Sequence, residues 1–479
     1  MSGSFAVPYG YTAARGTFPS YLQDRHLATI GPTRSGKGAT VIVPALLQAR
    51  HSVIVIDPKG QNAAITAAWR RRMGQEVVVL NPFGLHDGPP WNLPRHRYNP
   101  LAHLRIDDPN IVAEVAALSQ ALILTKGREP YFDDTARDLV SALILYLVDR
   151  LGPRATLGHL RRLVTLIGSR SSQAAELLVA MSHSPHRFIR EPIGRFKDPE
   201  ARDIASAINT AITQTAFLDD PALGDLSGSG ALTGCDIDLM QLKRWPTTVY
   251  VVLPGHYMDA YARFLRLVIS SAIAQLTSRP GGHPVLVILD EFARLENLPA
   301  VTAAFGFAAG FNLQLWPFLQ DLAQLKALYG EEWASILANC GLIQFFTPTD
   351  IETAEYLKRR GGLMTGETRS RSLGSFWSGG GGGSVSETRV PLLPFERTMS
   401  LSGSESLVFF AGVHDPLIAG RMPYWQIPRL AGMFDPDPYA ARNSVIMPPA
   451  PEAGSRLLAG PRAWLAAITD LSHTKTGRP

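Results

Sequence analysis

Cysteine is nearly absent from this sequence, because its 479 residues contain only Cys235 and Cys340. Two cysteines exclude a disulfide framework, and with histidines this scattered they also exclude a zinc cluster. The sequence has no apolar run of about 18 residues and no basic leader followed by an apolar core. We therefore expect a soluble, intracellular protein whose membrane association comes from a partner or from a segment outside this sequence.

Charged residues are also few, and lysine is the scarcest of them. They make up 18% of the chain, and only 8 of the 46 basic residues are lysine. The net charge of +5 is a mild indication of a nucleic-acid or acidic partner. The apolar content of 46% is ample for buried cores, and the length predicts about three domain-sized units.

The clearest motif that is present is a phosphate-binding loop. Residues 31–38 read GPTRSGKG, between the apolar run Leu27–Ile30 and a stretch with helical spacing. Glycines let successive N–H groups converge on an anion at a helix N-terminus, and Lys37 adds a charge for the outer phosphates. The alternative is a surface turn that contains a lysine. The predicted nucleotide-binding residues are Gly31, Thr33, Arg34, Ser35, Gly36, Lys37, Gly38 and Ala39.

Gly38 stands where such loops usually have Ser or Thr, whose hydroxyl ligates Mg²⁺. Thr40 has the nearest hydroxyl, but two residues further along a helix it should point elsewhere. A water would then take the ligand position. We expect hydrolysis to survive with weaker Mg²⁺ binding.

Apolar runs that end in polar or turn residues predict an α/β fold, a mostly parallel sheet with helices on both faces. The segments between them, such as Tyr261–Leu276, have helical spacing. Pro317 inside one run removes a ladder donor, so a bulge or an early strand end is expected there. The runs are Val53–Ile56, Val77–Leu80, Val249–Leu253, Val285–Leu289, Leu313–Leu319, Leu342–Phe346 and Leu407–Phe410.

Two acids follow the strand predicted at 285–289. We assign Asp290 to Mg²⁺, which it would hold through water, and Glu291 to general-base catalysis on the attacking water. A solvated acidic turn is the alternative, and the phosphate loop argues against it. Gln320, at the end of the next run, is predicted to contact the γ-phosphate or that water, unless it only opens the following helix.

Asp57 and Lys59 occupy the turn after the strand predicted at 53–56. One interpretation places them beside the nucleotide or at a subunit boundary. An ordinary Pro-Lys-Gly turn is equally compatible with the sequence.

The strand pattern stops between about residues 127 and 240, where the spacing is helical. We predict an all-α domain at 127–240, inserted between the two parts of a nucleotide-binding domain at 1–126 and 241–440. Residues 361–386 contain many glycines and serines and are predicted to be a flexible loop. Residues 441–479, rich in Pro and Ala, are predicted to be a tail.

A series of motifs resembles the TraG/TraD-like coupling proteins of type IV secretion and conjugation systems. Besides the phosphate loop, these are DPKG at 57–60, NPL at 99–101, FDDTARDL at 132–139, LDEF at 289–292, QDLAQL at 320–325, YG at 329–330 and NC at 339–340. The resemblance implies a RecA-like P-loop ATPase domain that binds ATP and Mg²⁺, carries an inserted all-α domain and usually assembles into a hexamer. By this likeness Lys37, Asp290, Glu291 and Gln320 take the roles given above.

The resemblance also implies a function. Such ATPases hand relaxase-bound DNA or effector proteins to a secretion channel, with inner-membrane components of the system as further partners. The protein is then expected at the cytoplasmic face of the inner membrane, through its partners. Family members usually begin with transmembrane helices, which this sequence lacks.

A second departure concerns the arginine that relatives often carry between the Asp-Glu motif and the sensing glutamine. Residues 295–319 contain neither Arg nor Lys. An arginine finger contributes about 10³–10⁵ in rate, so we expect a slow, DNA-stimulated ATPase unless Arg294, Arg359 or Arg360 substitutes. The alternative is a recruitment platform with nucleotide-regulated assembly and little or no ATPase activity. A small-molecule kinase or GTPase is a third hypothesis.

Two basic segments are candidate contacts for DNA or protein. Four arginines between 359 and 371 precede Phe376 and Trp377, and backbone neutralisation with base stacking is how proteins hold single strands. The basic half of the predicted helical domain is suited to an acidic substrate or adaptor, and the resemblance links that domain with recruitment. Solvated surfaces are the alternative in both cases. The candidates are Arg359, Arg360, Arg369, Arg371, Arg161 and Arg162.

Overall fold

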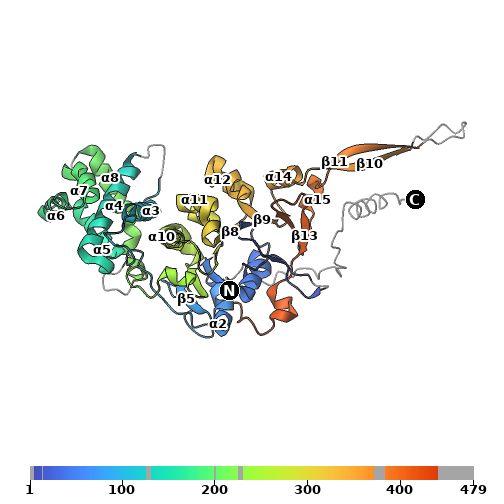
Figure 1. Cartoon of the computed structure of the whole chain (residues 1–479), viewed down its shortest axis with the longest axis horizontal. Coiled ribbons are helices and arrows are strands. Elements are labelled where there is room, and N and C mark those ends of the chain that lie inside the picture. Colours follow the sequence, from blue (N-terminus) through green and yellow to red (C-terminus); the bar gives the residue numbers. More distant parts are fainter. Residues whose placement is uncertain are drawn as a thin grey trace, which may run out of the picture.

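A computed structural model describes residues 5–12, 15–125, 131–198, 201–224, 230–371 and 383–440. A large sheet with helices packed against it forms the body of the molecule (Figure 1). A lobe of helices lies at one end of this body, and a two-stranded ribbon projects from the other end.

The sheet of the body has nine strands. They are β3 (His26–Ile30), β4 (Ser52–Asp57), β5 (Glu76–Leu80), β6 (Thr247–Val252), β7 (Val285–Leu289), β8 (Leu313–Leu319), β9 (Cys340–Phe345), β12 (Glu405–Phe410) and β13 (Leu417–Gly420). Their order is β13-β12-β9-β3-β8-β7-β4-β6-β5. The seven strands from β9 to β5 pair in parallel, and β12 pairs antiparallel with β9 and β13. The predicted mostly parallel sheet is confirmed.

Both faces of the sheet are buried, which explains the continuous apolar runs in the sequence. In β4, Val53 and Val55 belong to one apolar cluster, while Ile54 and Ile56 belong to another. Successive side chains of a strand point to opposite faces, so the two clusters are the cores above and below the sheet.

Helices cover the two faces. On one face α1 (Val43–Gln48) and α2 (Gln61–Arg72) supply residues to the cluster that contains Val53. On the other face the helices are α3 (Ile111–Leu122), α10 (Met258–Leu276), α11 (Pro299–Phe307), α12 (Leu322–Tyr329) and α13 (Trp333–Ala338). Across the described part of the chain, no helix has the length and apolar character needed to cross a membrane.

The expected bulge or early strand end at Pro317 is wrong. Pro317 lies opposite Leu289, the last residue of β7, and β8 continues to Leu319 by pairing with β3. The proline falls where the pairing of β8 passes from one neighbouring strand to the other. The missing N–H is therefore accommodated inside a central strand.

The lobe consists of helices that follow one another along the chain. They are α4 (Tyr131–Leu151), α5 (Leu157–Gly168), α6 (Ser172–Ser182), α7 (Arg187–Ile193), α8 (Arg202–Thr215) and α9 (Pro221–Gly224). The long helix α4 packs against α5, α7 and α8, and α3 contacts both α4 in the lobe and α10 in the body. The boundaries 127 and 240 of an inserted domain remain a prediction.

The prediction of a flexible loop at 361–386 is wrong for the residues near its two ends. β10 (Leu363–Arg371) pairs antiparallel with β11 (Gly383–Pro391), and the two strands form the ribbon that leaves the body after α14 (Ile351–Gly361). Cross-strand pairing over nine positions outweighs the glycine and serine content that suggested a loop. Residues 372–382 and the predicted tail at 441–479 lie outside the described residues.

The remaining short elements close the edges of the body. β1 (Val7–Pro8) pairs antiparallel with β2 (Ser20–Tyr21), and Val7 and Tyr21 join the same apolar cluster as α1. The short helix α15 (Phe395–Met399) packs against α14 beside the ribbon.

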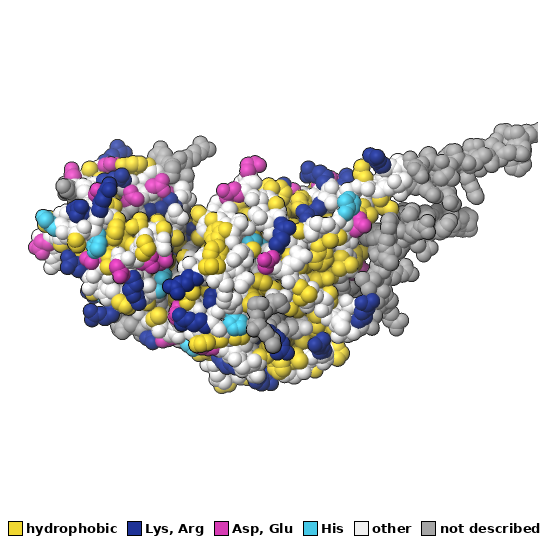
Figure 2. Space-filling view, in the orientation of Figure 1, with side chains coloured by type: hydrophobic (Ala, Val, Ile, Leu, Met, Phe, Trp, Pro, Cys, Tyr) yellow, Lys and Arg dark blue, Asp and Glu magenta, His cyan; other side chains and the backbone are white. Residues whose placement is uncertain are grey.

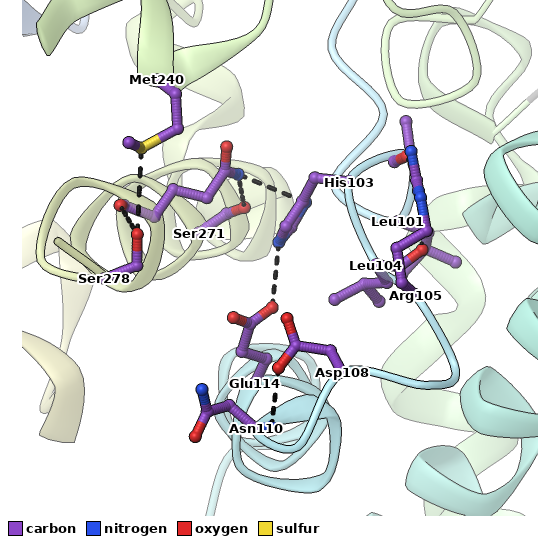
Figure 3. Close-up of polar contacts among 12 residues, drawn as sticks. Leu101, His103, Leu104, Arg105, Asp108, Asn110, Glu114, Met240, Ser271 and Ser278 are labelled. Atoms are coloured by element: carbon purple, nitrogen blue, oxygen red, sulfur yellow. Dashed lines mark hydrogen bonds and ion pairs between the residues drawn. The ribbon is translucent and has the colours of Figure 1, made fainter.

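Polar side chains tie the connection between β5 and α3 to the body (Figure 3). The Nε2 atom of His103 lies 3.3 Å from Oε2 of Glu114 in α3, and the amide of Gln275 in α10 lies 3.3 Å from Nδ1 of the same histidine. The amide of Gln275 also donates to the hydroxyl of Ser271 at 3.0 Å. One histidine therefore bridges α3, which contacts the lobe, and α10, which belongs to the body.

Candidate active site

The loop between β3 and the following helix has the backbone geometry of a phosphate cradle. The N–H of Gly31 donates to the carbonyl of Leu319 at 3.0 Å, which joins the start of the loop to β8. Arg34 and Gly36 have left-handed φ values of 60° and 89°, which turn the N–H groups between them toward one side. A Cβ on Gly31 would lie 2.7 Å from Cβ of Phe346, so this position requires glycine.

Lys37 lies folded against this loop. Its ammonium group donates to the carbonyls of Gly31 and Pro32, the second at 3.0 Å. Burial lowers the pKa of Lys37, while the negative charges of Asp290 and Glu291 raise it. The structure thus brings the lysine near the two acids that the sequence assigned to the same site.

The helix after the loop begins with a wide turn. Gly38–Ile42 form a π-helical turn, and α1 continues from Val43. Pro44 accounts for the change, because it has no N–H to donate to the carbonyl of Thr40, four residues earlier.

The side chains near Gly38 leave room for a further ligand oxygen. An added Cβ on Gly38 would meet no heavy atom within 4 Å. The hydroxyl of Thr40 donates to the carbonyl of Gly36 at 2.9 Å, so this hydroxyl is occupied within the helix. As expected from its position, Thr40 does not replace the missing hydroxyl.

Asp290 directly follows β7, with its carboxylate beside the phosphate loop. Burial, together with the charges of Glu291 and Asp57, raises the pKa of Asp290 to about 7, and the charge of Lys37 opposes this rise. The N–H of Glu291 donates to Oδ1 of Asp290 at 3.0 Å and fixes the rotation of the carboxylate. Negative charge therefore exceeds positive charge in this part of the site.

Neighbouring strands bring Glu291 and Gln320 together. Because β7 and β8 pair in parallel, their carboxyl ends meet at the same edge of the sheet, and Nε2 of Gln320 lies 3.4 Å from Oε2 of Glu291. Glu291 has a left-handed φ of 53°. Such a conformation in a non-glycine residue persists only where the surroundings determine it, and here it turns the carboxylate toward the glutamine.

Asp57 lies at the end of β4, the strand beside β7. Its Oδ2 accepts from the N–H of Ala63 at 2.8 Å, so the buried carboxylate caps the start of α2. Burial raises the pKa of Asp57 to about 6, and backbone hydrogen bonds oppose the shift. Lys59 is exposed, and its carbonyl accepts from His86 and from Tyr439. Asp57 therefore affects Asp290 through its charge, while its carboxylate oxygens bind the backbone at the start of α2.

The sequence analysis missed two buried arginines, one bound to the phosphate loop and one bound to the segment that follows Glu291. Arg421, after β13, donates to the carbonyl of Ser35 in the phosphate loop at 2.8 Å. Arg266 of α10 donates to the carbonyls of Leu295 and Asn297, in the segment after Glu291, and to two carbonyls at the end of α3. Arg266 stands between Leu265 and Leu267 in the apolar part of α10, which is a sequence signal for it. No comparable signal marks Arg421.

The candidate DNA contacts lie at the ribbon end of the body. Arg359 is exposed at the end of α14, and Arg360 lies over the rings of Tyr356 and Phe409, with its guanidinium carbon 5.0 Å from the centre of the second ring. Arg369 and Arg371 belong to strand β10 of the ribbon. All four lie away from the lobe, so the two groups of candidate arginines occupy opposite ends of the molecule.

In the lobe, the candidates Arg161 and Arg162 differ sharply. The side chain of Arg161 is only 12% exposed, and its guanidinium binds Asp219 together with the carbonyl of Ile212. Arg162, on the next position of α5, is exposed. On the face drawn in Figure 2, cations and acids alternate over the lobe, whereas apolar side chains gather over the body. Arg162 is therefore the better placed of the pair for a partner.

Of the arginines named as substitutes for the missing one, Arg294 is the nearest to the acids in sequence. It follows Glu291 by three residues, and its guanidinium pairs with Asp259 at 2.8 Å. Both side chains are more than half exposed, so this ion pair is weak enough to open.

A family model described as type IV secretory system conjugative DNA transfer matches residues 4–444. Protein VirD4 of Agrobacterium fabrum is 28% identical over 440 residues, which cover 89% of this chain and 63% of that protein. A conjugal transfer protein TraG of Escherichia coli is 25% identical over 479 residues, which cover 90% of this chain and 70% of that protein. The chain thus spans about two thirds of the length of these relatives.

Solved structures of a plasmid coupling protein, TrwB, have the same fold. TrwB in complex with a non-hydrolysable GTP analogue has a TM-score of 0.59 at 15% identity, over 88% of this chain and 96% of that one. TrwB in complex with ADP and Mg²⁺ has a TM-score of 0.58 at 14% identity, over 84% of this chain and 85% of that one. The body is therefore a RecA-like P-loop domain.

Proposed function

Since the chain belongs to the type IV secretory system conjugative DNA transfer family, we propose that it is an ATP-dependent coupling protein that delivers substrates to a secretion channel. Its substrates would be relaxase-bound DNA or effector proteins, and its membrane partners the inner-membrane components of the system. Active units would be hexamers at the cytoplasmic face of the inner membrane.

One observation carries the ATPase part of the proposal. Lys37, the two acids after β7 and Gln320 come from three separate segments and meet at the carboxyl edge of β3, β7 and β8. Phosphoryl transfer needs positioning and charge stabilisation more than covalent chemistry, and these side chains supply both. Nucleotide-bound TrwB structures support the same use of the fold.

The donor set fits a magnesium ion. Hard carboxylate oxygens are the ligands that Mg²⁺ prefers, and in the described part of the chain the carboxylates of Asp290, Glu291 and Asp57 face a single cation, Lys37, so a divalent cation would compensate their charge. Asp290 would hold the ion through water, and Mg²⁺ would neutralise charge on the phosphates. Lys37 would bind the outer phosphates, Glu291 would accept a proton from the attacking water, and Gln320 would orient that water.

Gly38 makes this proposal specific. Without a hydroxyl at this position we expect Mg²⁺ to bind weakly, and the open space at Gly38 admits a serine. Gly38→Ser should lower the Mg²⁺ concentration that gives half-maximal ATP turnover. A titration that leaves this concentration unchanged would reject the role of Gly38.

The alternative is a recruitment platform in which nucleotide controls assembly and little work is done. Two observations favour it, the glycine at position 38 and the lack of any arginine or lysine between 295 and 319. Under this alternative, nucleotide binding persists while DNA leaves ATP turnover unchanged.

The deciding experiment measures ATP hydrolysis with and without DNA, together with the mass of the protein in solution. We expect turnover that rises with DNA in the wild type and is lost in Lys37→Ala. Arg187→Ala, on the surface of the lobe, serves as a matched control and should behave as wild type. Nucleotide binding without DNA-stimulated turnover would replace the motor with the platform. A chain that binds no nucleotide would overturn both.

A further inference from the structure

We propose that Arg421 is a positioning residue for the phosphate loop, so that the antiparallel edge of the sheet completes the nucleotide site. This inference rests on the proposed nucleotide binding. It concerns a residue that belongs to none of the sequence motifs of the site. Arg421 and Ser35 are 386 positions apart in the chain.

Arg421 reaches the loop from its back. The residue follows β13, is only 5% exposed and donates from Nη1 to the carbonyl of Ser35 at 2.8 Å. Ser35 lies between the two left-handed residues of the loop, Arg34 and Gly36. Arg34 keeps this conformation only where its surroundings determine it. The hydrogen bond to the neighbouring peptide is one such determinant.

The guanidinium is itself held in place. Nε donates to the carbonyl of Glu405 at 2.9 Å, and Nη2 donates to the carbonyl of Gly403. The planar group also stacks over the ring of Phe346, with its central carbon 3.6 Å from the ring centre. The guanidinium group of Arg421 is therefore held in one orientation by its contacts, and it links the phosphate loop to the β12–β13 hairpin.

The ring of Phe346 contacts both the guanidinium of Arg421 and the first residue of the phosphate loop. The same ring lies against Gly31, where any Cβ would come within 2.7 Å of the phenylalanine side chain. The loop is therefore backed at its first residue by the ring and at Ser35 by the guanidinium on that ring. With the Ser35 carbonyl held toward Arg421, the N–H groups of the next residues are free to face an anion.

The positive charge of Arg421 also favours phosphate binding by the loop. Its described hydrogen bonds go to main-chain carbonyls, which leave the positive charge in place. Burial lowers the pKa of Arg421 to about 10, and Glu405 opposes the shift, so the group stays charged at neutral pH. A buried cation behind the loop strengthens the attraction of the loop for phosphate.

The test compares nucleotide affinity in four variants, Arg421→Gln, Arg421→Lys, Arg70→Gln and Lys37→Ala, with the wild type, using a fluorescent ADP and a non-hydrolysable ATP analogue. Arg421→Gln should weaken both affinities about tenfold, the size expected when one hydrogen bond of a charged group is removed. Arg421→Lys, which keeps the charge and loses the fork, should lie between Arg421→Gln and wild type. In turnover, KM should rise while kcat stays nearly constant, because the loop binds ground state and transition state alike.

Arg70→Gln is the matched control. Arg70 is also buried and also donates to main-chain carbonyls, but at the far end of α1, at Leu46 and Ala49. The Arg70→Gln variant should have a lower melting temperature than the wild type. Its nucleotide affinity should stay within about twofold of wild type, a smaller change than the loss of one hydrogen bond to the nucleotide site would cause. Hydrogen exchange of the peptide that covers residues 31–39 should accelerate in Arg421→Gln and not in Arg70→Gln.

Each result decides the inference. Equal nucleotide affinity in Arg421→Gln and wild type overturns it, as does an equal loss of affinity in Arg70→Gln. Faster exchange restricted to the loop supports it even where Arg421→Gln is too unstable for titration. The two failures are distinguishable, because loss of binding in Lys37→Ala with normal binding in Arg421→Gln rejects only the role of Arg421. A wild type that binds no nucleotide rejects the proposed function as well.

Discussion

Two buried arginines of the body and two exposed arginines of the lobe are bound in opposite ways. In the body, Arg266 and Arg421 are buried and donate to main-chain carbonyls from several elements. In the lobe, Arg187 and Arg195 form exposed ion pairs with Glu191 and Asp138. Buried arginines bound to carbonyls hold the backbone in place, whereas exposed pairs exchange easily with solvent or a partner. The comparison teaches that buried arginines hold the backbone around the candidate site, whereas the exposed pairs leave the surface of the lobe adaptable.

The largest expected effect concerns Glu291, the proposed general base in the body. Glu291→Gln should lower ATP turnover about 10²–10⁴-fold, the contribution of a general base, with little change in nucleotide affinity. Glu296→Gln, an exposed carboxyl five residues later, is the matched control and should keep normal turnover. Steady-state turnover and equilibrium binding measure the two quantities. Equal rates for Glu291→Gln and wild type would remove Glu291 from the mechanism.

The second prediction tests whether the buried arginines of the body stabilise the fold. Arg266→Leu should lower the free energy of unfolding by about 3 kcal/mol, because it leaves buried carbonyls of α3 and of the segment after Glu291 without donors. Arg187→Ala in the lobe should leave unfolding unchanged. Urea denaturation measures both variants. If the two variants were equally stable, the contrast between body and lobe would be lost.

A third prediction sharpens the contrast at the surface. If Arg359 binds a DNA backbone, Arg359→Gln should reduce the slope of log affinity against log salt by about one unit for each phosphate that it no longer neutralises. Arg187→Gln removes the same charge from the lobe and should leave the slope unchanged. Binding isotherms at several salt concentrations give the slopes. Parallel behaviour of both variants would place DNA elsewhere.

The smallest expected effect concerns pH. The folded chain holds the proton of Asp290 up to about pH 7, while an unfolded aspartate releases it near 3.8. The unfolded state therefore binds fewer protons between these values, and this group makes stability fall as pH rises through that window. Asp290→Asn removes the effect. Its melting temperature should exceed that of wild type by about 1–2 °C at pH 8, with a smaller difference at pH 5.

The control for the pH effect is Asp259→Asn, which removes an exposed carboxylate paired with Arg294. Its melting temperature relative to wild type should not change between pH 5 and pH 8. Thermal unfolding of all three proteins in matched buffers measures this. A pH-independent difference for Asp290→Asn would show that the shifted pKa of Asp290 does not affect stability.

Much of the fold and of the site was predictable from local sequence. The apolar runs matched strands because both faces of a parallel sheet are buried, and strand ends such as Asp290 and Gln320 fell at one edge because parallel strands share direction. Pro317 was misjudged because its effect depends on which neighbouring strand is paired at that residue. The ribbon was misjudged because cross-strand pairing, which composition does not reveal, outweighed the local preference for a loop.

The arginine candidates show the limit most clearly. Arg161 and Arg162 are adjacent in sequence and equal in chemistry, yet Asp219, 58 positions away, binds one of them and leaves the other exposed. Only packing separates such neighbours, because a helix turns successive side chains by about 100°.

The sequence by itself determined the phosphate loop, the acids that follow β7 and the alternation of strand and helix. Each of these depends on neighbours within a few residues, and local spacing carries that information. The tertiary structure alone decided that Arg421 meets Ser35, that Arg266 joins α3 to the segment after Glu291, and which lobe arginines stay exposed to a partner. Those arrangements join segments far apart in the chain, so they exist only once the sheet has set its strand order.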